Sequence, residues 1–573
     1  MDRLYLKDRW IVVMGLLFIL CHSSFSASAV GASGPSWAKK AAKSVVTVKT
    51  FGADGSLIGS STGVFTTETG DVVSSYALFR GASRAVVIDA ADKEWPVDCI
   101  LGANETYDVV KFRVGGLKKA QALPVTPSLL AQGATLWLLP YHEQKSVPQL
   151  TVTKSETFSD GYGYYTLNAQ RSTLNTLQVG TPLLNEAGQV VALLQQPGTD
   201  ADTLLYAVSA QFADSLHTTG LSINDPVLKA INIRKALPRD ESQAQLTLYV
   251  AGSVLDSAAY AQLVDDYITQ FPQSQEGYVY RAQLAAAGQH YALADQDMEQ
   301  ALKTATRPDE VHYTWSRMVL QKALYQPDAD YPAWTLERAR QEAEEAYRLN
   351  PLPVYQQQQA GVLFADKQYA SAYSLYEQLF ASSLRSPDLF YEASRCQVLQ
   401  GDTARQLALM DSCVACFSRP YLKEAAPYLL ARAQALLDAG EHRRAVSDLN
   451  DYGELMRAQL SDGFYFLRYQ AELGGRLFQQ ALNDIGQAVS MAPQSELYLA
   501  EQASLQIRVG LYDDAVQTAR QLIALAPDHS DGYLFLGVAQ CLQDQKAEGR
   551  QNLARAKALG DPQADTFLER YGQ

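Results

Sequence analysis

Serine, histidine and aspartate side chains can together supply a nucleophile, its general base and the group that orients the base. Between residues 37 and 222 the histidines are His142 and His217. Serines are numerous there, Ser172 among them, but none follows a glycine-rich turn close to a histidine. Asp108 lies within the run Thr-Tyr-Asp-Val-Val-Lys-Phe at 106–112. The residue types for acyl transfer are present, but their spacing does not form an obvious catalytic set.

A segment at 176–193 resembles the one that carries the nucleophile in trypsin-like serine proteases of the Deg/HtrA kind. It reads Thr-Leu-Gln-Val-Gly-Thr-Pro-Leu-Leu-Asn-Glu-Ala-Gly-Gln-Val-Val-Ala-Leu, with Pro182, Asn185, Gly188 and Val190-Val191 in register. This register places Val179 where the family has its serine, and an isopropyl group has no nucleophilic atom. Leu177 replaces the glycine whose backbone helps to shape the oxyanion hole.

Earlier segments resemble the first barrel of the same family. Thr62-Gly63-Val64-Phe65 and the run 70–82 are similar to its motifs around the general-base histidine, and 106–112 to its aspartate motif. The resemblance places Ala77 at the histidine position and Asp108 at the aspartate position. A methyl group cannot take a proton, so we expect a degenerate triad without activity. The alternative role for Asp108 is structural, as a buried carboxylate that accepts backbone N–H bonds and helps to close the barrel.

The elements that must position these residues are short strands. Apolar runs rich in β-branched residues occur at 44–50, 85–89, 135–139 and 190–194, with glycine and proline between such runs. This pattern predicts an antiparallel all-β structure. The resemblance implies a trypsin-like double barrel over 37–222.

Length and charge limit the possible classes of protein. At 573 residues the chain is too long for one hydrophobic core, and 47% hydrophobic with 19% charged residues is typical of globular proteins. A formal net charge of -14 argues against nucleic acid as a partner, because phosphates require a concentrated basic surface. We therefore expect protein or peptide partners.

The N-terminus has the pattern of a secretory signal peptide at 1–29. Basic residues lead into the apolar run 10–21, and Ala27-Ser28-Ala29 forms a cleavage pattern. An uncleaved anchor is the alternative, but the run is shorter than the roughly 20 residues that span a bilayer. We expect an exported protein, periplasmic or associated with the cell envelope, with no integral membrane segment after cleavage.

The sequence changes character after residue 222. Breaks and charged residues predict an interdomain linker at 223–245 with few apolar anchors, and 246–573 has helical spacing. Similar residues recur 34 positions apart, as Ala481 and Ala515 do. This period resembles the tetratricopeptide repeat (TPR), which implies a superhelical all-α solenoid of about eight helix pairs. The expected fold class is therefore multidomain, a double barrel followed by this solenoid.

Candidate binding residues in the helical region are tyrosines. Tyr278, Tyr498 and Tyr533 are candidates for a groove that receives a peptide, with packing between helices as the alternative. Cys413 and Cys416 have the spacing of a redox or metal motif, but they lie in a helical context, so core packing or one structural disulfide is expected. We expect neither a cofactor nor a metal.

Two functions remain open from the sequence. The first is an exported, non-enzymatic scaffold or adaptor that combines a pseudoprotease domain with a protein-binding repeat domain. The second is a peptidase of unusual mechanism that recruits substrate through its repeats. In a third interpretation, the barrel only packs against the start of the superhelix.

Overall fold

A computed structural model describes residues 35–141, 147–170, 179–195, 204–327 and 330–571. The expected signal peptide at 1–29, and with it His142, Ser172 and Leu177, lies outside the described residues. The chain forms two compact units, Met1–Phe271 and Pro272–Gln573. None of the described helices is both long and apolar enough to cross a bilayer.

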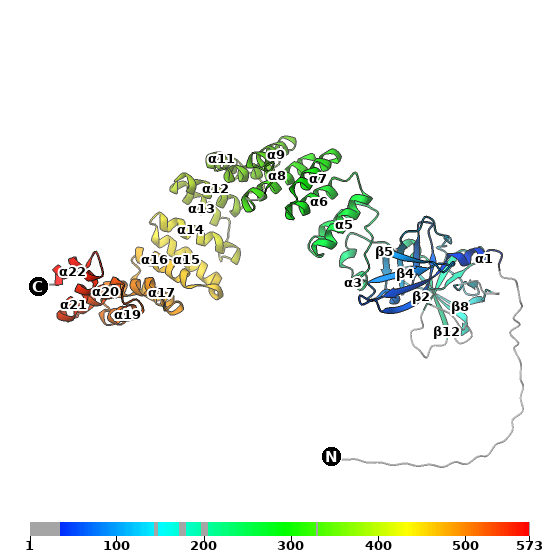
Figure 1. The fold of residues 1–573 in the computed structure, drawn as a ribbon, viewed down its shortest axis with the longest axis horizontal. Helices are drawn as coiled ribbons and strands as arrows, with labels where there is room; N and C mark the ends of the chain where they lie inside the picture. The colour runs from blue at the N-terminus through cyan, green and yellow to red at the C-terminus, as the bar shows by residue number, and fades with distance from the viewer. Residues whose placement is uncertain (1–34, 142–146, 171–178, 196–203, 328–329, 572–573) are drawn as a thin grey trace, which may run out of the picture. The chain divides into compact units, whose positions relative to one another are not determined.

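Two closed antiparallel barrels of six strands each form the first unit (Figure 1). The strand order is β1-β2-β3-β6-β5-β4 in the first barrel and β10-β11-β12-β9-β8-β7 in the second. The strands are β1 (Val45–Phe51), β2 (Leu57–Phe65), β3 (Asp71–Ser74), β4 (Arg84–Ile88), β5 (Glu94–Asn104), β6 (Val109–Val114), β7 (Thr135–Leu138), β8 (Gln149–Thr157), β9 (Gly163–Gln170), β10 (Pro182–Leu184), β11 (Val190–Gln195) and β12 (Leu204–Ser209). This is the expected double barrel.

Alternating apolar side chains fill each barrel. Val46 and Val48 point inward from β1, two residues apart as the pleat of a strand requires. They pack in the first barrel with Phe79 and Phe112, whose ring centres are 4.9 Å apart. The core of the second barrel is built in the same way and includes Leu136 and Leu138 of β7 and the fully buried Tyr165 of β9.

The segment after the barrels differs from the expected linker. After α3 (Pro226–Lys229) the chain runs along the first barrel, and Ile100 N–H donates to the Arg234 carbonyl while Ala236 N–H donates to the Ile100 carbonyl (2.8 Å each). Leu228, Ile231 and Ile233 are buried in the core of that barrel. The prediction of few apolar anchors is therefore wrong. Proline, asparagine and charged residues correctly indicated the end of the barrels. They did not reveal that Ile231 and Ile233 are two residues apart, the spacing that places both side chains on the inner face of an extended segment.

Helices make up the rest of the chain. In the first unit, α4 (Glu241–Ala251) and α5 (Ser257–Gln270) follow the segment at 226–237. The second unit contains α6 (Gln275–Ala287), α7 (Tyr291–Thr304), α8 (Pro308–Tyr325), α9 (Leu336–Leu349), α10 (Pro353–Ala365), α11 (Tyr369–Leu379), α12 (Pro387–Gln400), α13 (Thr403–Val414), α14 (Ala426–Asp438), α15 (His442–Met456), α16 (Asp462–Gly474), α17 (Phe478–Met491), α18 (Glu496–Arg508), α19 (Tyr512–Leu525), α20 (Ser530–Leu542), α21 (Lys546–Ala558) and α22 (Ala564–Tyr571). Each packs against the next along the chain (Figure 1). The expected order of folds, an all-β double barrel followed by an all-α array, is confirmed.

Small residues and tight turns recur along this array. The alanines that the sequence places at helix contacts, such as Ala294, Ala481 and Ala515, are fully buried. Most turns within a helix pair contain one residue with a positive φ, at positions 289, 367, 401, 440, 476, 510 and 544. A regular helix pair with a left-handed residue at its turn is therefore the repeating unit of this region.

Candidate functional site

Asp108 lies in the turn between β5 and β6, with its carboxylate directed at the segment that follows β3. Its Oδ1 accepts a hydrogen bond from Ala77 N–H (2.6 Å), and its Oδ2 accepts one from the Ser75 hydroxyl (2.7 Å). Burial raises the pKa of Asp108 above its ordinary value, although these two hydrogen bonds act in the opposite direction. Its φ of 50° lies in the left-handed region, which aspartate tolerates better than most residues.

Val179 begins a tight turn against strand β2. Its carbonyl accepts a hydrogen bond from Thr62 N–H (3.0 Å), and Gly180 N–H donates to the Leu194 carbonyl (2.8 Å). Gly180 has a φ of 82°, and a Cβ there would lie 2.1 Å from the Thr62 carbonyl oxygen. Only glycine fits this approach, so the turn fixes the Val179 backbone against the first barrel.

The three positions of the aligned triad are thus joined to neighbouring strands. Ala77 and Asp108 contact each other directly through the N–H bond. Val179 is connected to them less directly, through Thr62. Thr62 N–H donates to the Val179 carbonyl, and the Thr62 carbonyl accepts a hydrogen bond from the hydroxyl of Ser74 (2.8 Å), which is next to Ser75. Among the described residues, no hydrogen bond joins Val179 to Ala77 or Asp108.

The tip of the β8–β9 hairpin packs against Tyr107, the residue before Asp108. Tyr107 donates its hydroxyl to both carboxylate oxygens of Asp160, at 2.7 Å each. Burial, and then this aspartate, raise the pKa of Tyr107 to about 12, so the phenol remains a donor at physiological pH. Tyr162 stacks on Phe212 with ring centres 3.9 Å apart. The Tyr107 ring centre lies 5.6 Å from that of Tyr162 and 5.1 Å from that of Phe212, so these rings tie the residue before Asp108 to the second barrel.

The described surroundings of Asp108 fit its structural alternative. A serine hydroxyl and a backbone N–H both donate to the carboxylate, as expected for a side chain that holds a turn. His217 is exposed, and its Nδ1 lies 2.7 Å from the Ser215 carbonyl oxygen. In the described part of the first unit, we therefore find no imidazole oriented by Asp108.

The tyrosines selected from the sequence are engaged in packing. Tyr278 on α6 is buried and donates its hydroxyl to the Pro272 carbonyl (3.0 Å). Tyr498 on α18 donates to Asp462 (2.9 Å), with its ring centre 4.8 Å from that of Phe466. Tyr533 on α20 packs in the hydrophobic cluster of the last helices. The structure thus places the three on separate helices rather than in one shared pocket.

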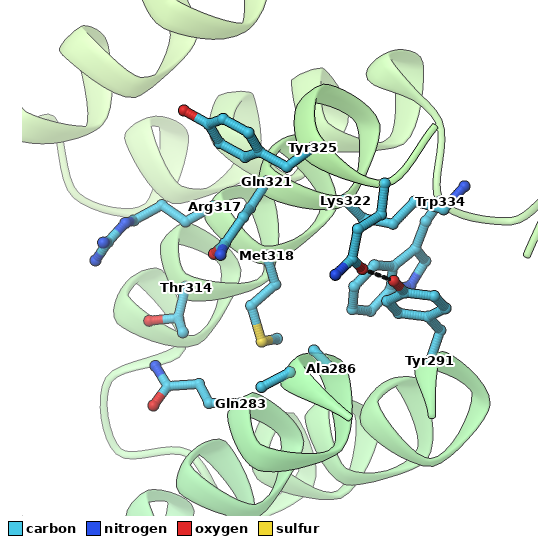
Figure 2. A pocket seen from close by; sticks show the side chains of 12 residues that line it. Gln283, Ala286, Tyr291, Thr314, Arg317, Met318, Gln321, Lys322, Tyr325 and Trp334 are labelled. Carbon is cyan, nitrogen blue, oxygen red and sulfur yellow. Dashed lines mark hydrogen bonds between the residues drawn. The ribbon is translucent and has the colours of Figure 1, made fainter. Parts of the chain in front are cut away.

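A pocket does open in the helical unit, between α6 and α8 (Figure 2). Its volume is about 260 Å³. Met318 points into the space between the two helices, with Tyr291 and Trp334 at one end and Arg317 at the other. Its remaining lining residues are Gln283, Ala286, Ala287, Thr314, Gln321, Lys322, Tyr325 and Gln326.

The aromatic end of this pocket is fixed by a carboxylate behind it. Asp295 accepts hydrogen bonds from Trp315 Nε1 (3.0 Å), the Tyr331 hydroxyl (2.6 Å) and Trp334 Nε1 (2.6 Å). Burial and this aspartate raise the pKa of Tyr331 to about 12. The Tyr291 hydroxyl donates to Gln326 Oε1, and its ring centre lies 5.0 Å from that of Trp334. The aromatic wall is therefore preorganised before any ligand binds.

Sequence reasoning missed this pocket. The selected tyrosines follow helical spacing, which also describes residues that pack between helices. A better signal was the connection between α8 and α9, which runs from 326 to 335 and carries Tyr331 and Trp334. Aromatic residues in a long connection are a sign of a binding surface.

The cysteines do not form disulfides with one another in the described structure. Cys413 is buried and free, and Cys416 is exposed and free. Burial raises the pKa of the Cys413 thiol to about 12, so this side chain behaves as an apolar core residue. The described residues contain no group of three or more His, Cys, Asp or Glu side chains placed to hold a metal ion.

Comparison with known proteins adds little. No protein-family model matches the chain, and no curated protein matches it. Among solved structures, the chain is similar to the serine endoprotease from Yersinia pestis with 15% identity and a TM-score of 0.25, over 30% of this chain and 61% of that one. The match therefore covers less than two thirds of that protein.

Proposed function

We propose that this chain is an exported, non-enzymatic protein-binding scaffold that joins a pseudoprotease unit to a helical unit of the TPR type. The observation that carries the proposal is the pocket between α6 and α8. It combines a fixed aromatic wall, the apolar side chain of Met318 and a rim of polar groups around Arg317. Such a surface suits a peptide segment, whose apolar side chains enter the pocket while its backbone meets polar groups.

The non-enzymatic part of the proposal is supported by residue types. Neither Ala77 nor Val179 has a group that can take a proton or attack a carbonyl, and Asp108 is engaged by Ser75 and Ala77. Ala77, Asp108 and Val179 lie after the expected signal peptide at 1–29, so cleavage of that peptide would not change them. Export itself is proposed from the N-terminal sequence pattern alone.

The binding claim is tested by recovery of partners from envelope extract on the immobilised chain 30–573. Tyr325 is 77% exposed at the edge of the pocket, and Tyr249 on α4 is 75% exposed, so they form a matched pair. We expect Tyr325→Ala and Arg317→Glu to lose partners that the unaltered chain recovers. Tyr249→Ala and Arg520→Glu, a matched charge change at an exposed position on α19, should retain them. Equal recovery by all four variants would contradict the pocket as the binding site.

The proposed absence of peptidase activity is tested with a fluorophosphonate probe and a casein substrate. The chain 30–573 should neither label with the probe nor cleave casein, because the serine and histidine positions hold Val179 and Ala77. Probe labelling that maps within 37–222 would instead support the peptidase of unusual mechanism, with the helical unit recruiting substrate.

A further inference from the structure

Arginines gather at three successive turns of the helical array, between α14 and α15, between α16 and α17, and between α18 and α19. Arg443 lies in the first turn of α15, Arg476 lies in the turn before α17 with a φ of 58°, and Arg508 ends α18. All three side chains are exposed. We call Arg443, Arg476 and Arg508 the arginine edge.

These three arginines differ from their neighbours in having no carboxylate partner in the described structure. Arg432 on α14 and Arg468 on α16, in the helices that precede the first two of these turns, pair with Asp448 and Asp484 at 2.7 Å and 2.5 Å. Arg444, next to Arg443, is neutralised by Asp411 and Glu441. The arginine edge is therefore a local excess of positive charge in a chain with a net charge of -14.

Other contacts hold the arginine edge in place without neutralising it. Arg443 Nε donates to the Gly475 carbonyl (3.2 Å), which links the first of the three turns to the second. The Arg508 guanidinium lies 4.9 Å from the centre of the Phe478 ring. Side chains that are already positioned lose less conformational freedom when they bind an anion.

Two surface cavities connect the three arginines. One of about 430 Å³ is lined by the turns that carry Arg443 and Arg476, and another of about 410 Å³ is lined by Arg476 and Arg508. Both are lined by Gly474 and Arg476, so the two cavities adjoin. The second cavity also contains Glu501, which accepts a hydrogen bond from the Tyr469 hydroxyl (2.7 Å).

Three corresponding turns elsewhere in the array each carry a carboxylate. These are Asp366 between α10 and α11, Asp402 between α12 and α13, and Asp544 between α20 and α21. A long polyanion such as nucleic acid, or an anionic membrane, would also extend over these carboxylates, which oppose its binding. A short anionic segment would meet only the arginine edge.

We propose that the arginine edge binds an acidic segment, rich in Asp and Glu, of a protein partner. A guanidinium donates two parallel hydrogen bonds to a carboxylate, so three arginines along adjoining cavities can hold several acidic side chains in sequence. This surface is formed by α14 to α19, whereas the pocket of the proposed function is formed by α6 to α8. The proposal for the arginine edge can therefore be wrong while the proposal for the pocket is right, and the reverse also holds.

The test measures fluorescence anisotropy of the chain 30–573 with a labelled peptide of alternating glutamate and alanine. The same peptide with glutamine in place of glutamate is the uncharged control. We expect Arg476→Gln to weaken binding of the glutamate peptide about 3- to 5-fold, as for one exposed ion pair. The triple variant Arg443→Gln, Arg476→Gln, Arg508→Gln should weaken it on the order of 30- to 100-fold. Salt raised to about 0.5 M should weaken binding in the unaltered chain.

A matched control variant is available at another turn. Lys367 is exposed, has a φ of 62° and lies between α10 and α11, so Lys367→Gln changes the same charge in the same backbone conformation. It should bind the glutamate peptide as the unaltered chain does. Circular dichroism checks that every variant is folded. If the triple variant is unfolded, the comparison of Arg476→Gln with Lys367→Gln tests the proposal by itself.

Three results would overturn the proposal. The first is absence of binding to the glutamate peptide, or equal binding of the glutamine peptide. The second is equal loss of binding in Lys367→Gln and Arg476→Gln. The third is retention of the chain on phosphatidylglycerol vesicles through the same arginines without binding of the glutamate peptide, which would assign the arginine edge to a membrane surface.

Discussion

At the scale of single residues, aspartates in both units serve as acceptors that organise their surroundings. Asp108 holds the segment at 75–77, and Asp295 holds two tryptophans and one tyrosine. A carboxylate can accept several hydrogen bonds at once, and charge-assisted bonds are stronger than neutral ones. The same side chain that orients a base in an enzyme can therefore orient a loop or an aromatic wall instead.

The structural role of Asp108 predicts an order of stability among its variants. Asp108→Asn keeps an oxygen that can accept from Ala77 N–H and tolerates the positive φ, so we expect a loss of about 1 kcal/mol. Asp108→Ala leaves both donors without their partner and puts a less suitable residue at this φ, so we expect a loss of about 2–4 kcal/mol. Urea unfolding followed by tryptophan fluorescence measures both. Equal stability of the two variants would show that the hydrogen bonds do not hold the turn.

Glu472 predicts a pH dependence of the helical unit. Burial, and then the negative charge of Asp484, raise the pKa of Glu472 to about 8, against the opposing effect of Arg468. The unfolded chain has its ordinary carboxyl pKa, so the folded state binds more protons than the unfolded state between about pH 4.5 and pH 8. The stability from this group is therefore complete below about pH 4.5 and is lost as the pH rises through about 8.

Glu472→Gln should remove that dependence. The unaltered chain should lose about 2–4 kcal/mol relative to this variant between about pH 5 and pH 9, measured by urea unfolding at each pH. Glu454→Gln, at an exposed pair with Arg457, is the control and should show little difference across the same range. A parallel response of Glu472→Gln and the unaltered chain would contradict the burial of this carboxyl group.

At the scale of helices, one ion pair repeats with the array. Arg281 pairs with Asp297, Arg432 with Asp448 and Arg468 with Asp484, each separated by 16 residues. This spacing joins the first helix of a pair to the second. Asp448 and Asp484 are almost completely buried, so each arginine satisfies a charge that cannot reach water.

Removing one partner of such a pair should be costly. We expect Arg432→Ala to destabilise the helical unit by about 3–5 kcal/mol, because Asp448 would remain buried and unpaired. The double variant Arg432→Met with Asp448→Leu should recover most of this loss, since apolar side chains of similar size can replace a buried pair. Arg457→Ala, at an exposed pair with Glu454, should change stability by less than about 1 kcal/mol. Thermal unfolding followed by circular dichroism compares the three, and a similar loss in Arg432→Ala and Arg457→Ala would contradict this reasoning.

The helical array was predictable from sequence because its contacts are local. Ala481 and Ala515 recur at a fixed period, and stacking of neighbouring helices requires small residues at these positions. The pocket was not predictable in the same way. Asp295 is separated along the chain from Tyr331 by 36 residues and from Trp334 by 39, so only the folded backbone brings it to them. In the barrel unit, motifs predicted the strands around Asp108, but its two donors follow from the conformation of the turn.

At the scale of the whole molecule, the division between the units does not follow the change in composition. Sequence composition changes after residue 222, whereas the first compact unit extends to Phe271. The reason is physical, because Leu228, Ile231 and Ile233 complete the core of the first barrel. Gly220 N–H also donates to the Gln243 side chain (2.9 Å), which connects the end of the barrels to α4.

The last prediction concerns fragments of the chain. A fragment 30–222 ends before the three apolar residues that cover the first barrel, and each buried side chain of this kind stabilises a fold by about 1.5–3 kcal/mol. We therefore expect 30–222 to unfold at much lower urea than 30–271, and Ile231→Ala in the longer fragment to cost about 2–4 kcal/mol. Leu221→Ala, at a position 60% exposed, is the control and should change little. The fragment 272–573 should be soluble and strongly helical by circular dichroism, because repeat arrays are stabilised by contacts between neighbours. Equal stability of 30–222 and 30–271 would mean that the segment at 226–237 is a linker after all.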